Sequence, residues 1–440
     1  MKTSRRQFLK SASAASLFTI LPSGIYAQNG PRISPNSKIR IACIGVGGRG
    51  GAAVGASSRE EIVALCDVDS KMAAGAFNKF KKAKQFTDYR EMFDKMGDQI
   101  DAVTISGPDH VHFVHAMEAI KRGKHVYVEK PLCQTIEQTR LLQAAAKKAG
   151  VKTQMGNQGH SKNGIRDFKE MVDAGLIGDI KEIHAWTNRP AGWWPQGKQE
   201  LPAPMEAPPT LDWDLWRNGV DTPFSTEYVP FKWRGWTMWG TGALGDMACH
   251  ILDPTFYALE LGMPDWIHAE AEGGSDVSFP NKSTVKFHFP ARKGRDEIIL
   301  TWFDGKGNLP PRPDMLEEGR KMGNPSGGSI TYGSKETVMT DSHAANVKII
   351  PELRAKELKA PEQTLRRVAK EDHFGDWFRA IRGEVEQASS HFDYAGELNE
   401  LVLLGSIAQR LPGQKLEWDT AKGTFKNSEV GNKLIKTALI

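Results

Sequence analysis

The stretch that decides the fold is Lys38-Ile39-Arg40-Ile41-Ala42-Cys43-Ile44-Gly45-Val46-Gly47-Gly48-Arg49-Gly50. It begins with a mainly apolar run, from Lys38 to Ile44, that predicts a buried strand. Glycines then follow in the spacing G-x-G-x-x-G, and the small residues after them predict the start of a helix. A strand that turns through such glycines into a helix is typical of the first unit of a doubly wound parallel sheet.

The same alternation of strand and helix continues along the chain. Further strands are predicted at residues 62–66, 102–106 and 125–128, and another ends at Met155. Helices are predicted between them at residues 70–82, 111–121 and 136–149. This alternation predicts an α/β fold class, in which residues 38–157 form an N-terminal Rossmann domain built on a doubly wound parallel sheet.

The glycine spacing has the context of a dinucleotide-binding turn, because Asp67 stands at the end of the next strand. In that role Gly45 permits the tight turn, Gly47 lets the backbone approach the pyrophosphate, and Gly50 lets the helix pack on the strand. The Asp67 carboxylate would accept hydrogen bonds from the ribose and repel a 2′-phosphate, so we expect NAD rather than NADP. Arg49 is an opposing signal, since it could reach a phosphate. A glycine-rich turn without a ligand is the plainer alternative.

Three further motifs follow in the chain: Gly107-Pro108-Asp109-His110-Val111-His112, Glu129-Lys130-Pro131-Leu132 and Gly245-Asp246-Met247-Ala248-Cys249-His250. Together with the glycine turn, and in this order, they make the chain resemble the Gfo/Idh/MocA oxidoreductases from about Lys38 to the C-terminus. The resemblance implies an NAD-binding first domain and a second domain, residues 158–440, with a large open, mostly antiparallel sheet. One face of such a sheet commonly packs on another subunit, so a homo-oligomer, a dimer or a tetramer, is expected.

The second half of the chain is compatible with that domain. Strands are predicted at residues 180–186, 266–271, 284–289, 297–302 and 329–332. Helices are predicted at residues 165–174, 372–382 and 398–411, and the last two are expected to pack on the second sheet.

The residues expected to bind the cofactor lie in these motifs and at the ends of the predicted strands. They are Gly45, Gly47, Gly48, Arg49, Gly50, Asp67, Ser106, Pro108, His110, His112, Glu129, Lys130 and Asn157. For His112 a packed histidine is an equal alternative, and polar residues such as Asn157 at a strand end are often simply solvated.

Oxidising a sugar hydroxyl requires a group that removes the O–H proton while hydride leaves the carbon. Lys130 follows a strand of the first domain, where ligands gather, and burial near another positive charge lowers the pKa of an amine. From position alone a solvated lysine is as good an interpretation. The resemblance favours catalysis, because the lysine of the family's Glu-Lys-Pro motif is catalytic.

Asp246 and His250 are four residues apart on a helix predicted to begin near Leu244, so both side chains share one face. Helix-dipole stabilisation and a packed core histidine are the alternatives. The resemblance implies that Asp246 holds substrate hydroxyls and that His250 relays or accepts the proton. No third ligand is apparent nearby, so no metal is expected. The expected substrate-binding residues are Lys130, Asn157, Gln158, Asp246 and His250.

Residues 188–239 form a long segment rich in Pro, Gly and Trp. Tryptophan faces stack on the C–H faces of sugar rings, so a carbohydrate platform is one interpretation. Stapling of a long loop, or an oligomer contact, is the other. Residues 305–328 are expected to form a loop near the mouth of the substrate site.

The N-terminal pattern predicts an export signal. Ser4-Arg5-Arg6-Gln7-Phe8-Leu9-Lys10 is a twin-arginine pattern, followed by a short apolar run and Ala27, where a peptidase could cut. A disordered basic tail is the alternative. We expect residues 1–27 to be a signal peptide, residues 28–37 a linker, and the mature chain periplasmic, exported by the twin-arginine (Tat) machinery and without a membrane span.

Charge and cysteine content limit the partners. The net charge of +5 comes largely from the leader, where four basic residues meet no acid, so nucleic acid is not expected as a partner. The four cysteines form no CxxC pair, which indicates neither a disulfide framework nor a zinc site.

Three functions are compatible with these residues. The first is an exported NAD-dependent oxidoreductase that acts on a hydroxyl or keto group of a sugar, polyol or glycoside. The second is a glycoside hydrolase or lyase that works through a transient 3-keto intermediate and recycles a tightly bound NAD, although such glycosidases usually lack the Asp-x-x-x-His spacing found here. The third is a catalytically silent periplasmic sugar-binding protein.

Overall fold

The computed structural model describes residues 37–438 apart from residue 293. The proposed signal peptide, residues 1–27, lies outside the described residues, as does the linker 28–37 except for Ser37. No helix in the described part of the chain is long and apolar enough to cross a membrane. Cys43, Cys66, Cys133 and Cys249 are all buried and form no disulfide.

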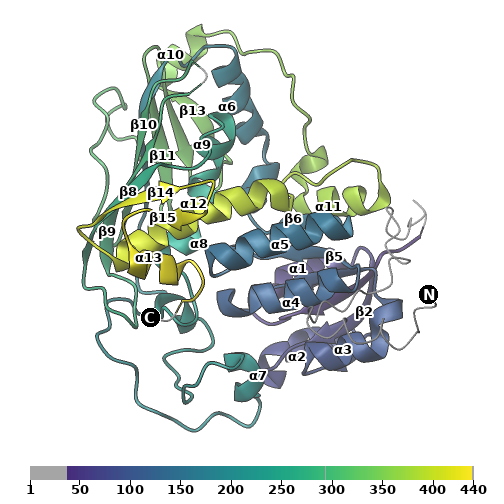
Figure 1. Cartoon of the computed structure of the whole chain (residues 1–440). Helices are drawn as coiled ribbons and strands as arrows, with labels where there is room; N and C mark the ends of the chain where they lie inside the picture. Colours follow the sequence, from purple (N-terminus) through teal and green to yellow (C-terminus); the bar gives the residue numbers. More distant parts are fainter. Residues whose placement is uncertain (1–36, 293, 439–440) are drawn as a thin grey trace, which may run out of the picture.

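Six parallel strands form the N-terminal sheet, in the order β3-β2-β1-β4-β5-β6 (Figure 1). The strands are β1 (Arg40–Ile44), β2 (Glu61–Cys66), β3 (Lys84–Phe86), β4 (Ala102–Ile105), β5 (His125–Val128) and β6 (Thr153–Met155). The helices between them are α1 (Gly50–Ser57), α2 (Ser70–Lys79), α3 (Tyr89–Met96), α4 (Asp109–Lys121) and α5 (Ile136–Ala149). The predicted doubly wound sheet is confirmed, and its order reverses between β1 and β4, where ligands of such sheets bind.

Strand β1 is buried on both faces because a helical layer covers each side of the sheet. Ala42 and Ile44 pack in a core with α3, α4 and α5, whereas Ile41 and Cys43 pack in a second core on the opposite face. That second core includes side chains of α1 and α2 and also Trp377 of α11 (His373–Arg382). The prediction that this helix packs on the second sheet is therefore wrong, since its apolar face covers the first sheet.

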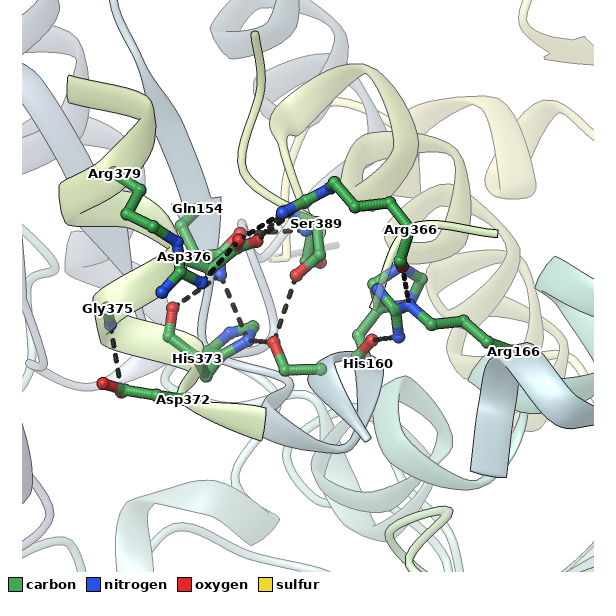
Figure 2. A network of polar contacts seen from close by, with 12 residues as sticks. Gln154, His160, Arg166, Arg366, Asp372, His373, Gly375, Asp376, Arg379 and Ser389 are labelled. Atoms are coloured by element: carbon green, nitrogen blue, oxygen red, sulfur yellow. Dashed lines mark hydrogen bonds and ion pairs between the residues drawn. The ribbon is translucent and has the colours of Figure 1, made fainter. Parts of the chain in front are cut away.

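A buried polar network fixes α11 to the end of β6 (Figure 2). The ring of His373 donates through Nε2 to the carbonyl of Met155 at 2.7 Å and accepts at Nδ1 from Ser161 Oγ at 2.6 Å. Three residues further along the helix, Asp376 accepts from Arg366 Nη1 at 2.7 Å and from the Ser389 N–H at 2.7 Å. Both polar residues of the helix are thereby satisfied although they are buried.

Nine strands form the second sheet, in the order β13-β12-β11-β7-β10-β9-β8-β14-β15. All neighbouring pairs are antiparallel except β10 and β7, so the sheet is mostly antiparallel as predicted. The strands are β7 (Ile180–Thr187), β8 (Trp266–Glu272), β9 (Lys282–Phe289), β10 (Ile298–Asp304), β11 (Gly327–Gly333), β12 (Thr337–Asp341), β13 (Val347–Ile350), β14 (Lys415–Asp419) and β15 (Thr424–Phe425).

One face of this sheet meets the first domain through helices. The helices of the second domain besides α11 are α6 (Asn163–Asp173), α7 (Trp213–Arg217), α8 (Gly242–Ile251), α9 (Asp253–Ala258), α10 (Glu352–Glu357), α12 (Phe392–Arg410) and α13 (Glu429–Leu434). Figure 1 shows α12 lying beside α5, and its leucines share one core with residues of α5 and α8. This continuous core holds α8 against the carboxyl ends of the first sheet's strands.

Residues 188–239 cross from the second sheet to the nucleotide-binding domain. Their aromatic side chains form a separate core that includes Trp216, Trp233, Trp236 and Trp239, so the tryptophans largely staple a long loop. The loop pairs with the end of β2, because the Asp212 N–H donates to the carbonyl of Val68 at 2.9 Å. Trp193, which is 65% exposed, and Trp194 stand apart from that core.

None of residues 305–328 lines the cavity described below, near whose mouth the segment was predicted to lie. Leu316 packs instead with Trp186, Ile330 and Met339 on the second sheet. The apolar side chain of Leu316 explains this placement, since it covers apolar side chains of strands β7, β11 and β12.

Candidate active site

A cavity of about 620 Å³ lies where the two domains meet. One side is formed by the glycine turn after β1 and by the residues that follow β2, β4 and β5. The other side is formed by α8, the tryptophan-rich segment and His343, which follows β12. The cavity is thus placed at the reversal of strand order, in the position where open α/β sheets bind ligands.

The glycine turn has a conformation and a spacing that exclude other residues. Gly45 has a φ of +75°, and a Cβ there would lie 2.8 Å from the amide nitrogen of Gly107. A Cβ on Gly50 would lie 1.8 Å from the carbonyl oxygen of Gly45, so α1 can approach the strand only with glycine at this position. These contacts give the turn the close backbone approach that a dinucleotide-binding turn requires.

Asp67 faces this turn from the end of β2. Its Oδ2 accepts from the N–H groups of Val46 and Gly47 at 2.8 and 3.1 Å, and its Oδ1 accepts from the Asp69 N–H at 3.0 Å. Burial raises the pKa of Asp67, and these hydrogen bonds oppose that effect. The carboxylate lines the cavity, so its position fits recognition of a ribose hydroxyl.

Lys130 and Asp246 form the ion pair at the centre of the cavity wall. Lys130 Nζ lies 2.6 Å from Asp246 Oδ1 and 2.8 Å from the Asp246 carbonyl oxygen, and the two side chains are 13% and 11% exposed. Arg234 Nε lies 3.3 Å from the same carboxylate oxygen. Burial alone would raise the pKa of Asp246, but the charges of Lys130 and Arg234 outweigh it and hold this pKa far below its ordinary value. Asp246 is therefore ionised throughout the ordinary pH range.

His250 lies one helical turn beyond Asp246 on α8 and is buried in the same wall. Its Nδ1 has no hydrogen-bond partner among the described residues. Burial, with the charge of Lys130, keeps the pKa of His250 well below 6.5. A neutral imidazole with an unpartnered nitrogen is suited to accepting a proton.

Glu129 and Arg49 connect the glycine turn with the lysine motif. Arg49 Nε lies 3.3 Å from Glu129 Oε1, whereas the buried Glu129 Oε2 has no partner in the described part of the chain. Ser106 Oγ, next to the glycine turn, is also buried and unpartnered. Both residues line the cavity, so these unpartnered polar atoms lie within its wall.

Two family models match this chain. One describes an oxidoreductase family NAD-binding Rossmann fold and matches residues 39–157; the other describes an oxidoreductase family C-terminal alpha/beta domain and matches residues 161–277. The chain belongs to the Gfo/Idh/MocA family. Together the two matches span the glycine turn, Lys130, Asp246 and His250.

Two curated relatives each align with less than half of this chain. The glycosyl hydrolase family 109 protein of Solibacter usitatus is 34% identical over 202 residues, which are 41% of this chain and 44% of that protein. The scyllo-inositol 2-dehydrogenase (NADP(+)) IolW of Bacillus subtilis is 26% identical over 202 residues, 46% of this chain and 45% of that protein. The chain thus spans under half the length of these relatives.

Solved structures of other proteins share the fold over nearly their full length. The WlbA dehydrogenase of Bordetella pertussis, in complex with NADH and UDP-GlcNAcA, has a TM-score of 0.60, 17% identity, and coverage of 87% of this chain and 99% of that chain. The inositol dehydrogenase homolog of Azotobacter vinelandii, complexed with NADH and myo-inositol, has a TM-score of 0.57, 15% identity, and coverage of 89% and 100%. These likenesses show the shared fold of the Gfo/Idh/MocA chain.

The cavity brings together most of the residues singled out from the sequence of this Gfo/Idh/MocA protein. Those lining it are Gly45, Gly47, Gly48, Arg49, Asp67, Ser106, Pro108, Glu129, Lys130, Gln158, Asp246 and His250. A side chain at position 47 is excluded by the protein itself, since a Cβ there would lie 2.8 Å from Met72 Cβ.

Four of the expected residues lie behind the cavity wall, and three of them carry polar side chains bonded within the protein. His110 Nε2 donates to the carbonyl of Trp216 at 2.8 Å, and both ring nitrogens of His112 lie within 2.8 Å of carbonyl oxygens. Asn157 donates to Asp253 Oδ2 at 2.9 Å and accepts from Ser390 Oγ at 2.6 Å. Gly50 also stands outside the lining and acts through helix packing. In this structure the side chains of His110, His112 and Asn157 therefore bind other parts of the protein and do not line the cavity.

The cavity also contains polar residues that the sequence did not single out. Arg189 and Arg234 come from the tryptophan-rich segment, and His343 comes from the turn after β12. Asp109, in the predicted Gly-Pro-Asp motif, lies 3.2 Å from Arg234 Nη1. In the sequence Arg234 directly follows Trp233, which is a local signal, whereas Arg189 and His343 have no such neighbour.

Proposed function

We propose that this protein is an NAD-dependent oxidoreductase that acts on a hydroxyl or keto group of a sugar, polyol or glycoside. The observation that carries the proposal is one continuous cavity, which is lined by the glycine turn and Asp67 at one end and by Lys130, Asp246 and His250 at the other. Relatives named as inositol and levoglucosan dehydrogenases support a polyhydroxy substrate.

The residues present fit a nicotinamide dinucleotide. Gly45, Gly47 and Gly48 would hold it through their backbone, with Asp67 at the ribose and the free polar atoms of Ser106 and Glu129 nearby. When bound, such a cofactor exchanges a hydride with the substrate carbon.

The chain's own residues account for the proton. Lys130 Nζ spends two of its hydrogens on Asp246, which leaves a third to donate to a substrate oxygen. Asp246 holds the ammonium group of Lys130 in place, and the negative charge of Asp246 balances the positive charge of Lys130. His250, held neutral, accepts the hydroxyl proton during oxidation and returns it during reduction.

The proposal is tested on purified protein in two steps. Mass spectrometry and absorbance should detect retained NAD(H), or binding of added NAD(H), and a panel of sugars and polyols should then change the nicotinamide absorbance. A protein that neither retains nor binds NAD(H) or NADP(H) would refute the proposal.

A redox-assisted glycosidase is the second candidate, and the similarity to two glycosyl hydrolase family 109 proteins, at 34% and 33% identity, favours considering it. Transient oxidation at C3 of a glycoside acidifies the C2 proton, which permits loss of the aglycone; addition of water and re-reduction then give net hydrolysis. Incubation of an aryl glycoside in deuterated water separates the candidates. Deuterium at C2 with aglycone release indicates elimination, whereas oxidation without exchange indicates a dehydrogenase.

We propose NAD rather than NADP as the cofactor, and tight binding. Asp67 points a carboxylate at the turn. Arg49 and Arg90, which also line the cavity, pair with Glu129 and Asp88 at 3.3 and 2.8 Å, and this pairing weakens their attraction for a 2′-phosphate. The name of the relative IolW specifies NADP(+), so the choice between NADH and NADPH has to be measured for this protein. Titration of the protein with NADH and NADPH should show tighter NADH binding, and Asp67→Asn should reduce the difference.

The place of action and the assembly state are also proposals. We propose export through the twin-arginine pathway to the periplasm and assembly into a dimer or tetramer. Cell fractionation of the wild-type chain and of a variant with both Arg5 and Arg6 changed to lysine tests export, and light scattering of the purified protein tests assembly. A silent sugar-binding protein is excluded if Lys130→Ala abolishes turnover, because a pure binder has no turnover to lose.

A further inference from the structure

Arg189 lies in the cavity wall, where the Asp246 carboxylate acts on its charge from beyond ion-pair distance. It follows β7 at the start of the tryptophan-rich segment and shares the cavity with Lys130, Asp246 and His250. Among the described residues no carboxylate lies within ion-pair distance of its guanidinium, and its Nε is buried without a hydrogen-bond partner. A partly buried guanidinium in this condition favours the binding of an anion.

The other cations of the cavity wall are already paired. Lys130 lies 2.6 Å from Asp246, Arg234 lies 3.2 Å from Asp109, and Arg49 pairs with Glu129. Around the reacting end, Lys130, Arg189 and Arg234 face the carboxylates of Asp109 and Asp246, which leaves one positive charge uncompensated. One negative charge on a ligand would balance it.

Aromatic rings hold the Arg189 guanidinium without using its N–H groups. Its Cζ lies 4.0 Å from the ring centroid of Trp193 and 5.7 Å from that of Trp194. Such stacking stabilises the cation and fixes its plane while its hydrogen-bonding edge stays available. Trp193 is itself 65% exposed, which leaves area for the C–H face of a sugar ring.

We propose that Arg189 and Trp193 form a subsite for a monoanionic sugar, with the Arg189 fork binding a carboxylate of the uronic acid type. The planar guanidinium matches a carboxylate through two parallel hydrogen bonds. A sulfate ester carries the same single charge and is the other source of this chemistry. The inference rests on the proposed function, because it names the substrate class of the same cavity.

Calorimetric titration of the NAD-loaded protein tests the subsite with three probes that share one ring. These are methyl glucopyranoside, methyl glucopyranosiduronate and methyl glucopyranoside 6-sulfate. We expect the uronate to bind at least about tenfold more tightly than the neutral glycoside. A stronger preference for the sulfate would also support the anion subsite and would assign the sulfate ester as its source.

Variants of Arg189 decide whether this residue is responsible. Arg189→Gln should remove the preference for an anion, and Arg189→Lys should restore only part of it, because a lysine keeps the charge but not the fork. Lys232→Gln is the matched control, since the Lys232 side chain is 44% exposed, pairs with Glu227 and does not line the cavity. Arg189→Lys also remains informative if the glutamine variant does not fold.

Equal binding of the three probes by the wild-type protein would overturn the subsite, as would an anion preference that survives in Arg189→Gln. Binding and turnover are measured separately, so the two proposals fail in different ways. Turnover of neutral sugars without anion preference would leave the proposed oxidoreductase and remove the subsite. Arg189-dependent binding of the uronate without any redox turnover would leave the subsite and remove the proposed function.

Discussion

The imidazole rings of His250 and His343 lie with their centroids 4.5 Å apart and their planes inclined by 36°. His250 comes from helix α8, whereas His343 follows strand β12 of the second sheet, and both residues line the cavity. Burial and the charge of Lys130 lower the pKa of both rings. His343 covers His250 and helps to keep it buried and neutral.

His250→Gln should lower kcat by about 10²- to 10⁴-fold, the range expected for loss of a positioned acid–base group. The glutamine keeps a polar side chain of similar reach but cannot accept the proton. Binding of NADH, measured by fluorescence titration, should change little because the glycine turn is untouched. A variant with wild-type kcat would show that another group takes the proton.

His343→Ala should change the pH profile rather than simply the rate. Opening the cavity beside His250 reduces its burial, so its pKa rises towards 6.5. A histidine that must be neutral to accept a proton loses activity as the pH falls through its pKa. The variant should therefore lose kcat/KM between about pH 7 and pH 6, where the wild type stays level.

His343→Phe is the matched control for this experiment. It keeps an aromatic ring over His250 and so keeps the burial, but it removes the second imidazole. We expect its pH profile to follow the wild type. Identical profiles for the alanine variant and the wild type would contradict a covering role for His343.

Lys130→Gln should lower kcat by at least about 10²-fold while the chain stays folded. Arg234 still faces the Asp246 carboxylate at 3.3 Å, so this buried charge is not left without a partner. Loss of one of two cations should nevertheless lower the stability, by about 1–3 kcal/mol. Steady-state kinetics and thermal unfolding check the two effects, and Lys124→Gln, away from the cavity, is the control.

His373 makes the stability depend on pH. Burial lowers the pKa of His373 to about 4, whereas an unfolded histidine titrates near 6.5. The unfolded state therefore binds more protons as the pH falls from 6.5 towards 4, and the free energy of unfolding decreases over that window. His373→Gln should be less stable than the wild type at pH 7, and the gap should narrow by about 2 kcal/mol at pH 5.

Urea unfolding at the two pH values measures this change, with His268→Gln on β8 as the control. A gap that is the same at pH 7 and pH 5 would show that His373 does not titrate as described. The other buried groups that titrate in this range are present in both proteins and cancel in the comparison.

The sequence predicted those parts of the molecule whose structure depends on residues close together in the chain. β1, the glycine turn and α5 depend on apolar runs, glycine spacing and helix periodicity, and the residues of the Glu-Lys-Pro and Asp-x-x-x-His motifs do meet in one cavity. The predicted packing partner of α11 was wrong, because an amphipathic pattern indicates that one face of the helix is buried but not which sheet it packs against.

Long-range contacts account for the rest. His343 reaches His250 only because β12 lies next to β11 and β7 in the second sheet, a register that no local pattern encodes. Likewise the carbonyls that bind the rings of His110 and His112 become neighbours only after folding. A histidine in a motif can therefore look like a ligand contact in sequence and carry structural hydrogen bonds in the fold.

Gly50 and Gly51 offer a paired test of the glycine turn, because both belong to the start of α1. A Cβ at Gly50 would lie 1.8 Å from the Gly45 carbonyl oxygen, whereas a Cβ at Gly51 would meet nothing within 4 Å. Gly50→Ala should displace the turn, weaken NADH binding at least about tenfold and lower Tm by several degrees. Gly51→Ala should leave NADH binding unchanged and stabilise the helix by about 0.5–1 kcal/mol. Fluorescence titration and thermal unfolding of both variants decide the matter, since equal behaviour would mean that the turn does not need its third glycine.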